Sequence, residues 1–480
     1  MEATLVALSR RELEGVIREA GRSVQATLNA QYRSFDTYFL ELLDGSERWM
    51  EAEFVSAVGG AYERNAGVLR EFYTELRRFY RGSPLSLEEV LERLWSSLLE
   101  RQLKATANVT VATTTPTTSS DDFLDCSLKE AELMQLQGHA PHNLHAPLLR
   151  TLLSARAFAQ ALTTAGEVVR KVSQVPLSDV CVDAVMKMMY CGQCHGVGSL
   201  KPCGNYCSNV MRGCLANQAD LQPEWKTLIA TLVQVASSFG GRPSLDEVLF
   251  SIPVRISEAL RHLQDNMDIF THKVRQACGV VSVEPTESSE SVRRKRAVTV
   301  LHYKSSPSAA VRLEVQVSDV SNKLKEMQNF WLHLLVTLCK SRSSTTNDHC
   351  WNGMSKAKYL PEVTGSGLAN QINNPEVEVD ITKPDMSMRQ QIMTLKVTTS
   401  RLLAALSGHD LDFQDNSDEV SGSGSGLCLD QSCTHSRVFV SKGSTYYPTE
   451  NKKAKGTANQ NLPCHALLLL SLASLLLRRH

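Results

Sequence analysis

The segment YCGQCHGVGSLKPCGNYCSNVMRGCLANQADLQPEW, residues 190–225, contains five of the 13 cysteines in this 480-residue chain. Cys181 lies a few residues ahead of it and extends the cluster to six. Cysteines at this density indicate either disulfides in an oxidising compartment or a metal site in a reducing one. The two interpretations predict different folds, and the rest of the chain is needed to choose between them.

A zinc site is one of these interpretations. Cys191, Cys194, Cys203 and Cys207 form two close pairs that suit tetrahedral zinc, and His195 could replace one thiolate. The intervening residues carry no knuckle-like repeat, and one zinc ion would leave the other cysteines unexplained. This alternative describes an intracellular zinc-binding helical protein built on the Cys191–Cys207 cluster.

The periodicity of apolar residues predicts the fold class. Strand-like alternation is scarce, whereas apolar residues recur at helical spacing, and capping boxes begin at Ser86 and Ser244. We therefore expect an all-α fold, an elongated multi-helix structure with long helices. The expected helices cover residues 11–43, stopping at Gly45, and 61–81, 87–103, 146–173, 177–190, 223–238, 244–251, 256–278, 317–339 and 386–406.

Three segments lack this period. Residues 107–122 are rich in Thr and Ser, predict a solvated loop, and include the glycosylation sequon Asn108-Val109-Thr110. Residues 279–312 predict a polar internal loop with the exposed basic run Arg293-Arg294-Lys295-Arg296. From 407 to 460 nothing indicates a packed core, and we expect a disordered stalk.

Composition and charge limit the classes of function. Apolar residues make up 42% of the chain, which is enough for a real core, and the 51 Lys and Arg balance the 51 Asp and Glu. This balance gives no argument for a nucleic-acid partner. The histidines include no His-Glu-x-x-His pair, no glycine loop that cradles phosphate precedes a helix, and GSGSG at 422–426 lacks the flanks of a nucleophile elbow. We expect neither an enzyme nor a cofactor.

The two ends of the chain give conflicting indications about its compartment. The apolar tail ALLLLSLASLLL, 466–477, would span about 18 Å as a helix, which is too short to cross a bilayer. Small residues near Gly456, a polar spacer and this tail are the three parts of a glycosylphosphatidylinositol (GPI) attachment signal. We place the attachment at Gly456, with Ala454 and Ala458 as alternatives. The first residues, however, show no signal peptide. Either the anchor hypothesis is wrong or this chain lacks its natural beginning.

A family resemblance favours the disulfide interpretation. Residues 190–225 resemble the signature segment of glypicans, which are cell-surface heparan sulfate proteoglycans, in every cysteine interval and in the ending Gly-Cys-Leu-Ala-Asn-Gln-Ala-Asp. A second block, CWNGMSKAKYLPEVTGSGLANQINNPEVEVDITKPDM (350–386), is similar to the glypican-1 and glypican-2 branch. The likeness runs from about residue 9 to the C-terminus.

The resemblance implies a set of disulfides. Cysteines that match the family's bridges pair Cys126 with Cys278, Cys181 with Cys214, Cys203 with Cys350, and Cys207 with Cys339. In the family, the cysteines that match Cys191 and Cys194 bond to a cysteine-rich N-terminal segment that follows a signal peptide. Neither part is visible here, so we expect Cys191 and Cys194 to lack their family partners.

The resemblance also assigns the serine repeat. Ser421, Ser423 and Ser425 each precede a glycine and follow an acidic patch, as expected of heparan sulfate attachment sites. By contrast, we expect the pairs Ser366-Gly367 and Ser407-Gly408 to be structural.

The basic run in the internal loop fits a proprotein convertase that cuts after Arg296, with Arg293 as the first basic residue of the site. The expected bridges Cys203–Cys350 and Cys207–Cys339 straddle this site, so the two cut chains would stay joined until reduced.

These expectations combine into one account. Residues 10–406 form a glypican-like helical core, 407–460 a stalk for glycosaminoglycans, and 461–480 a GPI signal tail. The function is that of a cell-surface heparan sulfate proteoglycan, held in the outer leaflet of the plasma membrane or shed from it. As a co-receptor it would present heparin-binding growth factors and morphogens of the FGF, Wnt and Hedgehog classes.

Overall fold

The computed structural model describes residues 2–57, 60–110, 120–278, 299–303, 307–340, 342–345 and 348–411. The chain divides into two compact units, Met1–Phe413 and Gln414–His480. The second unit lies wholly outside the described residues, and all structural statements below concern the first.

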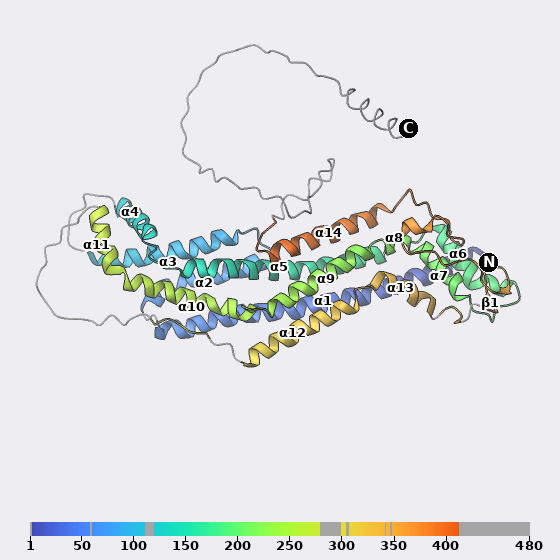
Figure 1. Ribbon diagram of the computed structural model, residues 1–480, viewed down its shortest axis with the longest axis horizontal. Helices are drawn as coiled ribbons and strands as arrows, with labels where there is room; N and C mark the ends of the chain where they lie inside the picture. Colours follow the sequence, from blue (N-terminus) through green and yellow to red (C-terminus); the bar gives the residue numbers. More distant parts are fainter. Residues whose placement is uncertain are drawn as a thin grey trace, which may run out of the picture. The chain divides into compact units, whose positions relative to one another are not determined.

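The first unit is built almost entirely from α-helices (Figure 1). The described residues also contain one two-stranded antiparallel sheet, in which Cys350 is opposite Ala357 and Trp351 is opposite Lys356. The all-α prediction is therefore confirmed. In chain order the elements are α1 (Glu2–Ala57), α2 (Gly60–Tyr80), α3 (Leu87–Thr110), α4 (Ser120–Leu133), α5 (Ala140–Ser173), α6 (Asp179–Cys194), α7 (Gly204–Cys214), α8 (Ala216–Ala219), α9 (Gln222–Phe239), α10 (Leu245–Asp265), α11 (Met267–Ala277), α12 (Pro307–Glu326), α13 (Phe330–Lys340), β1 (Cys350–Trp351), β2 (Lys356–Ala357), the 3-10 helix η2 (Leu368–Gln371) and α14 (Met386–Leu406).

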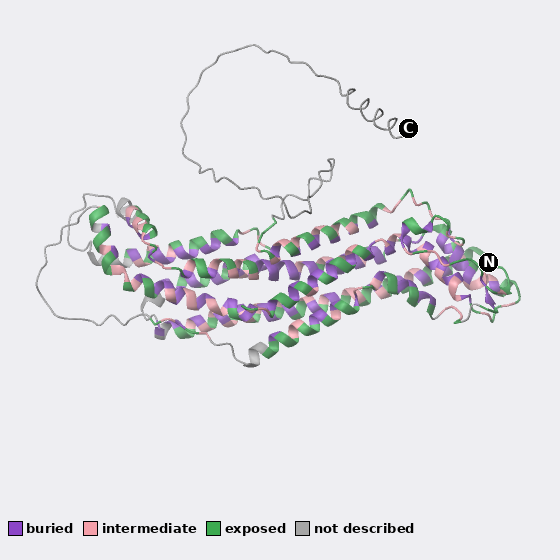
Figure 2. Cartoon of the chain, in the orientation of Figure 1, coloured by how far each residue is buried: buried purple, intermediate pink, exposed green. Residues whose placement is uncertain are grey.

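The long helices form one part of this unit, which we call the helical arm: α1, α2, α3, α5, α9, α10, α12 and α14. Helix α5 contacts α1, α10 and α14, so it lies at the centre of the arm (Figure 1). Phe35 of α1 packs against Phe158 of α5 and Phe239 of α9, with ring centroids 4.8 and 5.1 Å away. Figure 2 shows the buried residues following the inner faces of these helices. Apolar burial therefore holds the arm together.

Helix α1 does not stop at Gly45, so that predicted end is wrong. A glycine inside a helix costs roughly 1 kcal/mol relative to alanine. Here it permits close packing, because a Cβ at Gly45 would lie 3.3 Å from the Phe250 ring of α10. The hydroxyl of the next residue, Ser46, is buried and donates to the Leu249 carbonyl at 2.7 Å. Contacts with α10 therefore carry α1 past the glycine.

The predicted gap between helices 244–251 and 256–278 is also wrong. Helix α10 runs through Pro253, which is buried together with Ile252 and Ile256. Burial of these side chains outweighs the backbone hydrogen bond that proline removes. The break falls instead at Asn266, between α10 and α11.

The predicted helix 317–339 is two helices. Residues 327–329 separate α12 from α13, and the indole nitrogen of Trp225 donates to the Met327 carbonyl at 2.8 Å. A side chain thus satisfies a carbonyl at the end of α12, which allows the chain to turn there.

The two predicted loops are shorter than expected. Helix α3 extends to Thr110 and α4 begins at Ser120, so Asn108 lies in the last turn of a helix and not in a loop. Helix α12 begins at Pro307, inside the expected loop 279–312. The convertase residues Arg293 and Arg296 lie outside the described residues, as do Ser421, Ser423, Ser425 and Gly456.

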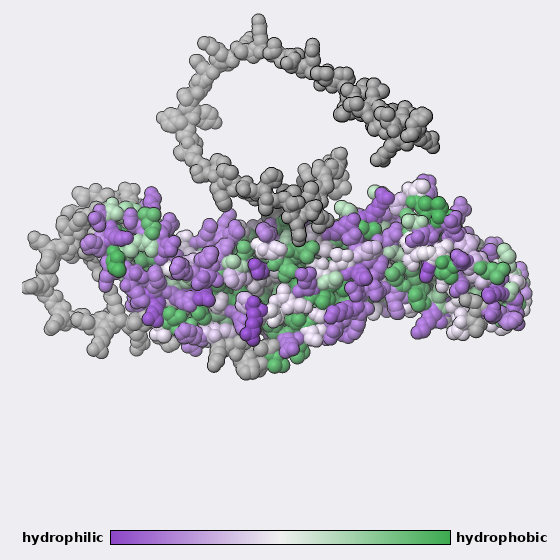
Figure 3. All heavy atoms as spheres, in the orientation of Figure 1, coloured by the Kyte–Doolittle hydropathy of each residue, from purple (hydrophilic) through white to green (hydrophobic). Residues whose placement is uncertain are grey.

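Hydrophilic side chains cover much of the face drawn in Figure 3, with smaller hydrophobic patches between them. Among the helices of the described ranges, none combines the length and the apolar character that a membrane span requires.

Candidate functional site: the cysteine lobe and the end of the last helix

A second core lies beside the arm and contains six of the disulfide cysteines. We call this region the cysteine lobe: α6, α7, α8, α13 and the segment 350–379. Three disulfides cross it, Cys181–Cys214, Cys203–Cys350 and Cys207–Cys339, with Cα–Cα distances of 5.0, 5.0 and 5.8 Å. Cys181, Cys203 and Cys207 are fully buried. The lobe therefore brings the two sequence blocks 190–225 and 350–386 into one structure.

A fourth disulfide, Cys126–Cys278, ties α4 to the end of α11, with a Cα–Cα distance of 5.8 Å. All four pairs that the resemblance implies are thus formed in the structure. Each of three bridges closes a loop of more than 100 residues, since the sequence separations are 152, 147 and 132. Bridges across such long loops restrict the unfolded chain strongly.

Trp351 joins β1 to the cysteine cluster. Its carbonyl accepts from the Cys203 N–H at 2.9 Å, and its own N–H donates to the Lys201 carbonyl at 3.0 Å. Its ring packs on Gly192, where an added Cβ would lie 3.5 Å from the indole. The backbone beside the Cys203–Cys350 bridge is therefore fixed on both sides.

Asn209 of α7 organises the loops of the lobe. Its amide nitrogen donates to the Tyr359 hydroxyl at 3.0 Å and to the Glu362 carbonyl at 2.9 Å, and its oxygen accepts from the Thr364 N–H at 2.9 Å. The Tyr359 hydroxyl in turn donates to the Glu376 carboxylate at 2.8 Å. Partial burial raises the pKa of Glu376 above its ordinary value, and the Tyr359 hydrogen bond and the Lys187 charge oppose the rise. No local pattern in the sequence marks Asn209, because its partners lie at least 150 positions away along the chain.

The pair Ser366-Gly367 has a structural role, as expected. Gly367 has φ of +91°, which favours glycine, and a Cβ there would approach the Asp220 carboxylate to 2.6 Å. The same carboxylate accepts from the Leu368 N–H at 3.1 Å. Ser407 caps α14 and Gly408 follows with φ of +82°, so this second pair ends a helix as expected.

Cys191 and Cys194 form no disulfide in the described part of the chain. Both lie in the last turn of α6, where Cys191 is half-buried and Cys194 is exposed. Burial raises the pKa of the Cys191 thiol, and the neighbouring Cys194 adds to the rise. At neutral pH Cys191 is therefore held further toward the thiol form than an ordinary cysteine.

The zinc alternative is wrong for this fold. Cys203 and Cys207, two of its four ligands, are bonded to Cys350 and Cys339 and have no thiolate to offer. Within the described ranges no cluster of His, Cys, Asp and Glu side chains could hold a metal ion.

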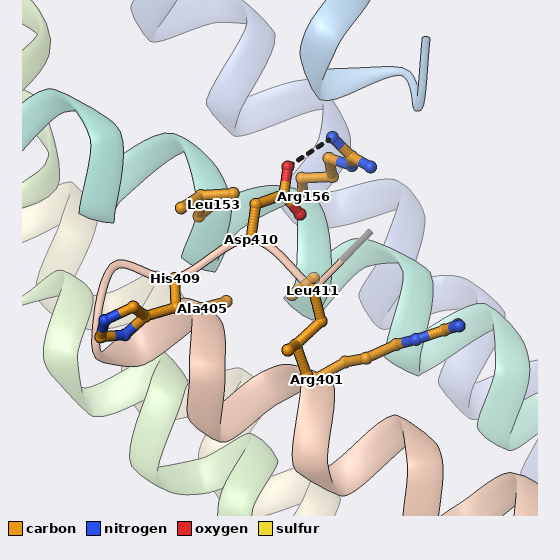
Figure 4. A pocket seen from close by; sticks show the side chains of 8 residues that line it. Leu153, Arg156, Arg401, Ala405, His409, Asp410 and Leu411 are labelled. Carbon is orange, nitrogen blue, oxygen red and sulfur yellow. Dashed lines mark ion pairs between the residues drawn. The ribbon is translucent and has the colours of Figure 1, made fainter. Parts of the chain in front are cut away.

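The last described residues lie against α5 at the end of α14 (Figure 4). The Asp410 carboxylate is 3.7 Å from the buried guanidinium of Arg156, which also lies 4.6 Å from the centroid of the Phe79 ring. Ser154 of α5 donates to the Ala405 carbonyl at 3.2 Å. These contacts fix the position from which the chain continues toward the serine repeat.

The helical fold and the four disulfides define a class, a disulfide-braced all-α protein of an oxidising compartment. The chain belongs to the glypican family, whose model matches residues 1–476. Glypicans are cell-surface heparan sulfate proteoglycans.

The chain is 46% identical to Glypican-1 of Gallus gallus over 492 residues, which cover 100% of this chain and 87% of the relative. It is 32% identical to Glypican-2 of Homo sapiens, over 88% of this chain and 75% of the relative. These similarities confirm the expected glypican-1 and glypican-2 branch.

Solved structures agree with this assignment. The crystal structure of the full-length glypican-1 core protein superposes with a TM-score of 0.76 at 45% identity, covering 85% of this chain and 90% of that chain. A structure of Dally-like protein in complex with O-palmitoleoyl serine has a TM-score of 0.66 at 27% identity, covering 85% and 89%.

Proposed function

We propose that this chain is the core of a GPI-anchored co-receptor that carries heparan sulfate on Ser421, Ser423 and Ser425 and has no enzymatic activity. Its heparan sulfate would concentrate growth factors and morphogens of the FGF, Wnt and Hedgehog classes at the cell surface. The observation that carries the proposal is the set of four disulfides in a chain that also contains the serine repeat.

The disulfides support passage through the secretory pathway. Bonds of this kind persist in the endoplasmic reticulum and outside the cell and are rare in the cytosol. The transferases that build glycosaminoglycans work in the same pathway, so a chain that acquires these bonds also meets those enzymes.

The serine repeat supports attachment of the glycan. Asp415, Asp418 and Glu419 precede three Ser-Gly pairs, and glycine gives the backbone the freedom to enter a transferase cleft. The pairs Ser366-Gly367 and Ser407-Gly408 have structural roles in the folded unit and serve as internal controls.

The mechanism follows from charge. Heparan chains carry dense sulfates and carboxylates, and basic ligands that bind a polyanion release its counterions, which makes affinity salt-dependent. Chains held at a membrane raise the effective concentration of a ligand near its receptor. The Dally-like complex supports including lipid-modified morphogens among the ligands.

Three further sites belong to this proposal. A GPI lipid would replace the tail after Gly456 and anchor the protein in the outer leaflet. Asn108 would carry an N-linked glycan. A convertase would cut after Arg296, and the bridges Cys203–Cys350 and Cys207–Cys339 would keep the products together until they are reduced.

The test uses intact cells that express the full chain with the family's secretory leader. We expect a high-mass smear for the wild type that heparan lyase collapses to a discrete band. The variant with Ser421→Ala, Ser423→Ala and Ser425→Ala should give the discrete band without lyase.

Ser366→Ala is the matched control, because it removes a Ser-Gly pair that the fold uses, and it should retain the smear. A lyase-resistant sharp band for the wild type, seen only after permeabilisation, would contradict the proposal.

A further inference from the structure

A groove of about 430 Å³ lies between α1, α2, α5 and α14. This volume falls in the range of about 300–1,000 Å³ that is usual for small-ligand sites. The groove is rich in polar groups, which include Asp36, Tyr80 and Gln160 and the cations Arg81 and Arg401. None of these residues belongs to the cysteine lobe or to the serine repeat.

One buried polar atom at the groove, the Gln160 amide oxygen, has no hydrogen-bond partner in the described part of the chain. The Tyr80 side chain is 4% exposed and lies next to Asp36. Burial raises the pKa of Tyr80, the charge of Asp36 and a hydrogen bond with it add to the rise, and the Arg81 charge opposes it. A buried oxygen without a partner is unfavourable, and a ligand hydroxyl that donates to the Gln160 oxygen would remove that cost.

The charges at the groove favour an acidic ligand. Burial lowers the pKa of Arg401, and the like charge of Arg156 lowers it further. Arg156 is paired with Asp410, and Figure 4 shows the Arg401 side chain extending away from that pair. Arg81, which is exposed at the end of α2, lines the same groove. An anion bound by Arg81 and Arg401 would offset the repulsion between Arg401 and Arg156, and it would gain charge-assisted hydrogen bonds.

The remaining lining favours a ligand with many hydroxyl groups. Thr163 and Thr398 already donate to the carbonyls of Ala159 and Thr394, so their oxygens are left to accept. Asp36 is a further acceptor, and the half-buried Tyr32 ring offers an apolar face. Hydroxyls, carboxylates and sulfates occur together in an acidic saccharide.

We propose that this groove binds a short stretch of acidic glycan of the heparan sulfate class. Arg81 and Arg401 take its carboxylate and sulfate groups, and Tyr80, Asp36 and Gln160 take its hydroxyls. The identification of the glycan rests on the proposed function, and nine residues of chain separate Leu411, the last described residue, from Ser421.

The test measures binding of a heparin-derived tetrasaccharide by calorimetry. The protein is the full chain with Ser421→Ala, Ser423→Ala and Ser425→Ala, so that no attached glycan competes. Arg81→Gln and Arg401→Gln should each weaken binding about tenfold and lower its salt dependence by about one ion. Arg389→Gln, which removes an exposed arginine from α14 outside the groove, should leave both quantities unchanged.

Thr163→Trp separates groove binding from general attraction between charges. It keeps every charge and places an indole in the groove, so binding should fall at least tenfold. Arg81 and Thr163 are exposed, so these two variants test the site even if Arg401→Gln disturbs the fold.

Equal affinities for Arg81→Gln, Thr163→Trp and Arg389→Gln, or no binding at millimolar tetrasaccharide, would overturn the groove proposal. Neither result would alter the lyase-sensitive smear, so failure here is distinguishable from failure of the proposed function.

Discussion

The helical arm and the cysteine lobe are stabilised by different means, although α1 contributes side chains to the cores of both. The arm's core is a continuous set of aromatic and aliphatic side chains on long helices, and among its described residues there is no cysteine. The lobe has short helices, loops and a two-stranded sheet, with three disulfides inside its core. Segments too short to bury much apolar area need covalent or polar cross-links, as in small secreted domains. The stability of the lobe should therefore depend on its disulfides being oxidised, whereas the stability of the arm should not.

The largest expected effect is in the arm. Phe158→Ala removes a fully buried ring that contacts Phe35 and Phe239, and it should lower the free energy of unfolding by about 3–5 kcal/mol. Denaturant titration measures the loss, which should be the same before and after reduction. Lys171→Ala, at an exposed position of the same helix, should change stability by less than about 0.5 kcal/mol. A loss that depends on reduction would erase the distinction between arm and lobe.

The next effect is in the lobe. Cys207→Ala combined with Cys339→Ala opens one long-range bridge and should cost about 2–4 kcal/mol. Limited proteolysis should then cut first within 342–379, while α5 and α9 stay intact. The distinction would fail if the double variant were as resistant to protease as the wild type.

A smaller effect is expected from the polar network. Asn209→Ala leaves the Thr364 N–H without its acceptor and should cost about 1–3 kcal/mol. Thermal unfolding of the oxidised protein measures it. Because Asn209 and the Cys207–Cys339 bridge stabilise the same loops, the triple variant should lose less than the sum of the separate losses. Strict additivity would show that the network and the bridge act independently.

The smallest effect concerns pH. The raised pKa of Glu376 means that the folded lobe holds this proton to a higher pH than the unfolded chain. Its contribution to stability is therefore complete below the ordinary value of 4.5 and is lost as pH rises through the raised value. Glu376→Gln should keep the Tyr359 hydrogen bond and flatten this decline. Melting temperatures across pH 4–7 test the prediction, and parallel curves for the two proteins would contradict it.

The arm was more predictable from the sequence than the lobe. Helical periodicity located α2, α9 and α14 closely, because each presents one apolar stripe to the core. The predicted helix ends were wrong where a tertiary contact outweighed the local sequence signal, as at Gly45 and Pro253. Helix α7 was not predicted, because it has only 11 residues and these include two glycines and two cysteines, which are poor helix formers.

The disulfide pairs and the groove differ in the same way. The disulfide pairs came from a family resemblance that spans two long blocks, and the structure forms all four. The groove has no such local pattern, since Arg81, Gln160 and Arg401 come from distant parts of the chain and meet only through helix packing. No short motif could have indicated it.

Hydrogen exchange of the full chain before and after reduction tests the division between arm and lobe most directly. We predict that amides in α5 and α9 keep their protection in reductant, whereas amides in α7 and 350–379 lose theirs. Equal loss in both regions, or unchanged protection in the lobe, would contradict the claim that disulfides hold the lobe and apolar packing holds the arm.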